Sequence, residues 1–211
     1  MRGFLIRAYS WLCSRNRKFY FYTGISGLFL ASLISLGIYY FTLPDEKNPQ
    51  CVGKDRWDVK ILTDNNAANI NYLPEIVSIE KLIAISPERS IGDNTPRFGI
   101  EFNTYSVKCR IREYKLSDDG DLHLVLQDVL HPEKTMIAEI PDMYCESVQK
   151  SSHLNEFISA RKFLQDSEID TSVYVVTGVA FYDKMHGQLG IAPNGIEIHP
   201  VLTISKNHEY R

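Results

Sequence analysis

Apolar and polar residues alternate through much of the second half of this chain, with the period of two that is typical of half-buried β-strands. The alternation is clearest over residues 105–116, and the turn-forming residues 117–120 end it. Between the third and fourth such runs, residues 152–164 carry apolar side chains at helical spacing. The pattern therefore predicts one helix and five strands, which cover residues 105–116, 122–128, 136–140, 172–181 and 195–204.

The order of these elements indicates a fold class. Three strands, a helix and two strands is the order of the five-stranded OB barrel, in which the helix commonly lies between the third and fourth strands. Other α+β sheets share the same string of elements and remain alternatives. We expect a mainly β protein with one or two helices and an OB-like barrel over residues 105–205, followed by a tail over residues 206–211.

The residues ahead of the predicted barrel give mixed signals. Residues 58–63 could form a short strand, whereas residues 78–85 fit a short helix capped by Ser78. Residues 86–97 hold two prolines, a glycine and an Asp-Asn pair, which predicts a loop. We interpret residues 57–104 as an N-terminal extension that packs on the barrel.

One long run near the N-terminus contains no charged residue. It covers residues 19–43, and a helix of this length spans about 37 Å, more than the roughly 30 Å of a bilayer's hydrocarbon core. Residues 1–18 hold five basic residues and no acidic one, which favours a cytoplasmic N-terminus. A cleaved signal peptide is the alternative, but its cleavage site needs small residues, and residues 39–43 are mostly bulky. We therefore expect a single-pass anchor in a bacterial inner membrane, a linker over residues 44–56 and a periplasmic domain.

The charge of the exported part limits its partners. Beyond residue 43 there are 18 basic and 26 acidic residues, which gives a net charge of −8. Such a charge argues against a nucleic-acid partner, because phosphate backbones attract basic surfaces.

Three of the four cysteines fall in the part that we expect to be exported, where disulfides persist. Because three is an odd number, at most one pair forms among them. Cys109 lies on the first predicted strand and Cys145 follows the third, and these strands can be neighbours in a barrel. The sequence thus predicts a Cys109–Cys145 disulfide and a free Cys51 in the linker.

Four residues are candidate ligands for a divalent metal ion: His123, His186, Glu197 and His199. Glu197 and His199 are two apart on a predicted strand, so they share a face. The spacing matches no established metal motif, which favours a structural role over ligation, with His186 bracing a turn and His199 closing the last strand. We expect the loop over residues 183–194 to bring His186 close to Glu197 and His199.

The segment over residues 177–202 resembles a signature of uncharacterised exported bacterial proteins. The shared motifs are His186-Gly-Gln, Ala192-Pro-Asn and a closing Glu197-Ile-His-Pro-Val, where the family carries Glu-Leu-His-Pro-Val. Other matching stretches are Trp57-Asp-Val-Lys, Tyr114-Lys-Leu, Asp121-x-His123 and Met136-Ile-Ala-Glu-Ile-Pro-Asp ahead of Cys145. The resemblance covers residues 57–204. The N-terminus differs, because we expect an anchor in this chain, whereas family members have a cleaved signal peptide. It implies one exported domain and names no reaction.

Two functional hypotheses follow from these observations. The first is a membrane-anchored OB-like module that binds a protein partner or joins an envelope assembly, without catalysis. The alternative is a metal-dependent, nuclease-like hydrolase that uses His123, His186, Glu197 and His199, with the Asp119-Gly-Asp121 hairpin as a second source of carboxylates. A third idea, a carrier of haem, depends on His208 after the last predicted strand.

Overall fold

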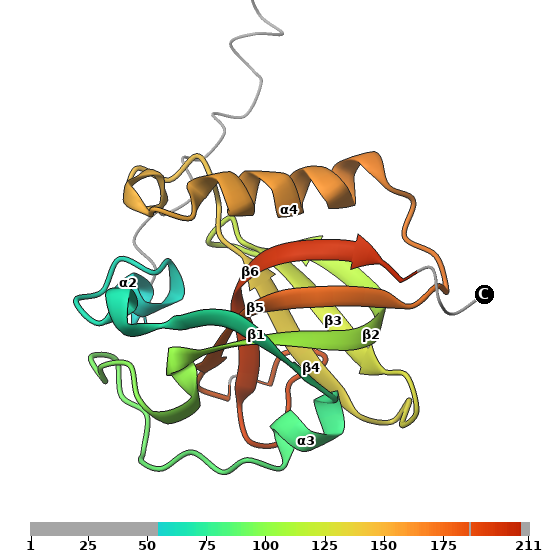
Figure 1. The fold of residues 1–211 in the computed structure, drawn as a ribbon, viewed down its shortest axis with the longest axis horizontal. Coiled ribbons are helices and arrows are strands. Elements are labelled where there is room, and N and C mark those ends of the chain that lie inside the picture. Colours follow the sequence, from blue (N-terminus) through green and yellow to red (C-terminus); the bar gives the residue numbers. More distant parts are fainter. Residues whose placement is uncertain (1–54, 186, 208–211) are drawn as a thin grey trace, which may run out of the picture. The chain divides into compact units, whose positions relative to one another are not determined.

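The computed structural model describes residues 55–185 and 187–207 (Figure 1). Six strands form one sheet, namely β1 (Asn71–Val77), β2 (Asn103–Leu116), β3 (Leu122–Asp128), β4 (Thr135–Ile140), β5 (Tyr174–Tyr182) and β6 (Ile196–Lys206). The α-helices are α2 (Trp57–Lys60), α3 (Ile79–Ile83) and α4 (Leu154–Asp166), and three 3-10 turns are η1 (Ala67–Asn69), η2 (Gly99–Phe102) and η3 (Val148–Lys150).

Strands β2 to β6 close into a barrel. Around it the order is β2-β3-β4-β6-β5, and β5 returns to pair with β2. All pairs are antiparallel except β4 with β6, which are parallel. The predicted mainly β fold with a five-stranded barrel is confirmed, and the positions of its strands and of the helix between the third and fourth agree with the prediction. This connectivity is compatible with an OB-fold.

The N-terminal extension differs in part from the prediction. The strand predicted over residues 58–63 is wrong, because α2 lies there and the amide of Lys60 donates to the carbonyl of Arg56. The sequence also gave no sign of β1, which pairs in parallel with β2 outside the closed barrel. Its side chains are almost all exposed and Pro74 interrupts it, so no alternation marks it. The α3 helix begins as predicted, with the Ser78 side chain accepting from the Lys81 amide.

Helix α4 lies across β6 (Figure 1) and closes one side of the hydrophobic core. Its residues Phe157, Ala160 and Leu164 are buried and recur at helical spacing. Between them Arg161 is also buried, and its guanidinium donates to the carbonyls of Gly120, Pro141 and Ile140. The helix therefore also ties the β2–β3 turn to the end of β4.

A buried ion pair fixes the extension to the barrel. The carboxylate of Glu101 accepts from both terminal nitrogens of Arg56, at 2.8 and 2.6 Å. It also accepts from the backbone amides of Phe98 and Tyr182. Arg56 has φ 64°, an unusual left-handed value for a residue with a side chain, and directly precedes α2. The pair thus holds a strained backbone in place from the barrel side.

The predicted Cys109–Cys145 disulfide is wrong. Cys109 is a free and buried thiol, and Cys145 is disulfide-bonded. Cys109 pairs with Asp128 at one end of β3, whereas the segment that carries Cys145 is tied to Asp121 at the other end. The length of β3 separates them by about 20 Å, far beyond the roughly 7 Å that a disulfide allows between Cα atoms. The other two cysteines lie outside the described residues.

Within residues 55–185 and 187–207, no helix is long and apolar enough to cross a membrane. The anchor predicted over residues 19–43 and the basic tail over residues 1–18 lie outside the described residues.

Candidate metal centre

Three neighbouring strands bring polar side chains together on one face of the barrel wall. His123 of β3 lies directly opposite Glu139 in the register with β4. On β6, Glu197 and His199 are two residues apart and so project to the same side. Asp121 precedes β3 and shares the side of His123 by the same alternation.

This face is opposite to the one that forms the hydrophobic core. Leu124, Ala138 and Ile198, which alternate with the polar residues, all belong to the core cluster. The polar face is nevertheless just as buried, since Asp121, Glu197 and His199 each have 0% of their surface exposed. Buried charged residues are rare unless they are paired or bind a metal ion.

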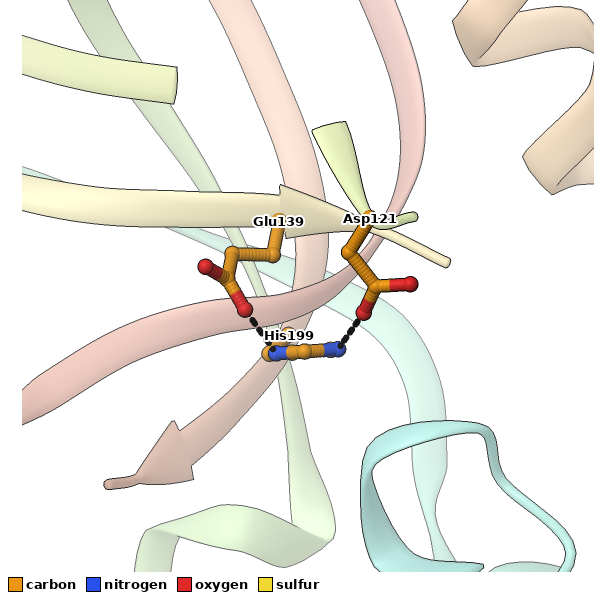
Figure 2. Close-up of side chains that lie close together, drawn as sticks. All are labelled: Asp121, Glu139 and His199. Carbon is orange, nitrogen blue, oxygen red and sulfur yellow. Dashed lines mark ion pairs between the residues drawn. The ribbon is translucent and has the colours of Figure 1, made fainter. Parts of the chain in front are cut away.

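The imidazole of His199 lies between two carboxylates (Figure 2). Its Nδ1 is 3.1 Å from Glu139 Oε2, and its Nε2 is 3.5 Å from Asp121 Oδ2. Glu197 Oε2 approaches on the Nδ1 side, at 3.8 Å. One ligand atom from each of Asp121, Glu139 and His199 lies within 4.8 Å of the others.

Several of these atoms make no hydrogen bond with any described residue, although they lie so close. They are Asp121 Oδ2, both carboxylate oxygens of Glu197 and both ring nitrogens of His199. The oxygens therefore lie off the N–H directions of the ring. An imidazole and a carboxylate that share a metal ion have this relation, because both aim at the ion instead of at each other. Such a group of buried, unsatisfied atoms requires an explanation.

The buried charges shift the pKa values of their neighbours strongly. Burial raises the pKa of Glu197 to about 7, and the pKa of Asp121 also rises because it is buried. Burial would likewise raise the pKa of Glu139, but His123 and His199 hold it well below the usual carboxyl range. Burial would lower the pKa of His199, but its three carboxylate neighbours raise it well above the usual value. Without an ion, these carboxylates therefore favour a proton on His199, and a metal ion bound at Nδ1 would displace that proton.

A second layer of contacts orients the cluster. His123 Nδ1 lies 2.9 Å from Glu139 Oε1, and His123 Nε2 lies 3.3 Å from the carbonyl oxygen of Leu189. Both partners are acceptors, which favours a doubly protonated ring: burial would lower the pKa of His123, but Glu139 raises it above the usual value. The other oxygen of Asp121, Oδ1, accepts from the backbone amide of Asp142. Glu139 and Asp121 are thus each fixed through one oxygen and leave the other toward His199.

Two segments from outside the three strands cover this face. The loop over residues 183–195 passes so close to β3 that a Cβ on Gly190 would lie 2.6 Å from the Val125 side chain. Helix α2 contributes Lys60, whose ammonium lies 3.3 Å from Asp183 Oδ2 and 5.3 Å from the centre of the Phe181 ring. The same Phe181 ring meets the His199 ring edge to face.

Of the four candidate ligands predicted from the sequence, the structure brings His123, Glu197 and His199 together, and His186 lies outside the described residues. Glu139 and Lys60 were not among the candidates. Glu139 had one visible signal, a carboxylate in the otherwise apolar strand Met136-Ile-Ala-Glu-Ile. Lys60 had none, because only the fold places α2 beside Phe181 and Asp183.

Comparison with known proteins adds no identification, since no family model, curated protein or solved structure matches this chain.

Proposed function

We propose that this chain is a membrane-anchored, exported module whose OB-type barrel binds a divalent first-row metal ion on its wall. The observation that supports the proposal most directly is the group of buried ligand atoms around His199 that lack hydrogen bonds among the described residues. Carboxylate oxygens and an imidazole nitrogen together suit zinc, manganese or ferrous iron.

The geometry favours one side of the imidazole for the ion. Asp121 and Glu139 lie at opposite ring nitrogens (Figure 2), so an ion bound to one nitrogen cannot reach both without rearrangement. Among the described residues, a second carboxylate, from Glu197, contacts the ring on the Nδ1 side alone. Ligand atoms around a tetrahedral ion are about 3.4 Å apart for bond lengths near 2.1 Å. The distances of 3.1 and 3.8 Å from Nδ1 bracket this value.

In this arrangement the inner ligands are His199 Nδ1, Glu139 and Glu197. Asp121 Oδ2, 3.5 Å from His199 Nε2, then places a negative charge behind the ring, which increases the basicity of Nδ1. His123 orients Glu139 through the 2.9 Å contact between its Nδ1 and Glu139 Oε1. Glu139 and His199 thus each have a neighbour on the side away from the ion, whereas neither oxygen of Glu197 makes a hydrogen bond among the described residues.

We expect the full-length chain, purified in mild detergent, to bind one divalent ion tightly. Equilibrium dialysis against Zn²⁺ or Mn²⁺, followed by elemental analysis, measures the ratio of ion to chain. The control is Ca²⁺, which prefers six to eight oxygen ligands and should bind more weakly at a site with a nitrogen ligand. A chain that retains no ion after dialysis against any of the three would contradict the proposal.

The burial of the ligands favours binding over hydrolysis. A hydrolytic metal site keeps one position open for water and substrate, and although three inner ligands leave such a position here, a substrate must also be able to reach it. Here Glu197 and His199 are fully buried, and Glu139 has only 6% of its surface exposed. We therefore propose that the ion stabilises or regulates a module that binds an envelope protein. Hydrolysis is the weaker candidate function.

The location is part of the proposal and has its own test. The uncharged run over residues 19–43 behind five basic residues supports an anchor with the barrel outside the cytoplasm. Protease added to intact spheroplasts should digest the large domain. Full protection of the domain, with digestion only after lysis, would place it in the cytoplasm instead.

A further inference from the structure

A lysine side chain reaches the metal-binding face from outside the barrel. Lys60 is the last residue of α2, and only 7% of its surface is exposed. Its ammonium contacts Asp183 and lies over Phe181, the ring that also packs on His199. In the register of β5 with β6, Phe181 is directly opposite Glu197. Lys60 therefore lies near Glu197, the carboxylate that approaches His199 on its Nδ1 side.

We propose that the Lys60 ammonium is a resident cation that competes with the metal ion for the carboxylates of this cluster and so sets the metal affinity. This inference rests on the proposed metal site and concerns its regulation.

The charge distribution supports competition. The carboxylates that attract Lys60 are those of Glu197, Asp183, Glu139 and Asp121, and this set contains both proposed carboxylate ligands. In a buried site the repulsion between an ammonium and a divalent ion is only weakly screened, because water is excluded. A bound ion would thus be repelled by Lys60, and the ammonium must move aside or weaken the binding.

The backbone around α2 is constrained, which keeps the Cα of Lys60 in position. Three residues with side chains around α2 have left-handed φ values, namely Asp55 at 65°, Arg56 at 64° and Leu62 at 60°. Such conformations are unfavourable for these residues and persist only where the surroundings impose them. The bonds from Arg56 to Glu101 supply that constraint. The flexible stem of a lysine still lets the ammonium shift by a few ångströms without moving the helix.

The test compares Lys60→Met with the wild-type full-length chain in detergent. Affinity for Zn²⁺ is measured by competition with a chelator, and the melting temperature is measured with and without Zn²⁺. We expect Lys60→Met to bind Zn²⁺ at least tenfold more tightly, to melt lower without the ion and to gain more from it. Lys60→Arg keeps the charge, so it should stay within a few-fold of the wild type.

Lys184→Met is the matched control, because it removes the same charge from a lysine that pairs with Asp55 and Asp93 and not with the cluster. It should leave the Zn²⁺ affinity unchanged.

Equal or weaker binding of Zn²⁺ by Lys60→Met than by a wild type that binds it would overturn the competition and leave the metal site standing. Failure of both the wild type and Lys60→Met to bind would refute the site itself. Binding by Lys60→Met alone would support the competition and would contradict the tight binding proposed for the wild type. If Lys60→Met does not fold, Lys60→Gln replaces it, because its side chain can still bond to Asp183. Tighter Zn²⁺ binding by Lys60→Gln than by the wild type would support the competition, and equal or weaker binding would overturn it.

Discussion

Replacement of Glu101 with alanine is expected to lower the free energy of unfolding by about 3–5 kcal/mol, because it leaves a buried guanidinium without its counter-charge. Glu101 has 0% of its surface exposed, and the side chain of its partner Arg56 has 1%. The same carboxylate accepts from the amides of Phe98 and Tyr182, so the substitution also leaves two backbone donors unsatisfied. The carboxylate thus links the start of α2, η2 and β5, and the Arg56 guanidinium, which also donates to the carbonyl of Tyr182, depends on it.

Urea unfolding of the full-length chain, followed by tryptophan fluorescence, measures this loss. Trp57 is a suitable probe, because it is the first residue of α2 and follows Arg56 directly. Glu80→Ala is the matched control, since Glu80 is a half-exposed carboxylate that pairs with Lys134 and His131 at the surface. Exposed ion pairs contribute little, so the control should unfold near the wild-type midpoint. If Glu101→Ala unfolded no earlier than Glu80→Ala, the buried pair would not be holding the extension.

The barrel could be predicted from the sequence because its strands have one apolar face and clear turns between them. Residues 105–116 alternate, and β2 covers residues 103–116. The exceptions lie in the extension. Strand β1 is exposed on both faces, so it has no alternation to detect, and its partner β2 is distant along the chain. Residues 58–63 are too few to distinguish a strand from a helix by period alone.

The candidate site could be predicted only in part, because the period of a strand does not show which residues of separate strands lie opposite each other. Glu197 and His199 lie on one strand, so the period of two was enough to place them on the same side. The contact between His123 and Glu139 depends on the register of β3 with β4, which the pattern does not define closely. The disulfide prediction was wrong because the period of a strand does not show which strands are neighbours. It assumed that the first and third strands are neighbours, whereas β3 lies between β2 and β4.

Replacement of Glu139 with glutamine is expected to weaken Zn²⁺ binding by about 100-fold or more, because it removes an inner ligand's charge while it keeps the side chain's shape. Changes to residues that only orient a ligand typically cost about 10–100-fold, and an inner ligand should cost more. Glu139 Oε1 is held by His123, which leaves Oε2, 3.1 Å from His199 Nδ1, as the oxygen that faces the ion.

Chelator competition on the full-length chain measures the affinity, and circular dichroism checks that the barrel still folds. Glu133→Gln is the control, because this exposed residue in the β3–β4 turn undergoes the same chemical change away from the cluster. The assignment of ligands adds an order to the expected results: Asp121→Asn, which changes only the residue behind the imidazole, should weaken binding less than Glu139→Gln does. The reverse order would place the ion on the Nε2 side of His199, with Asp121 as its ligand. Wild-type affinity in both variants would show that Zn²⁺ binds elsewhere on the chain, and that charges and protons alone hold this cluster together.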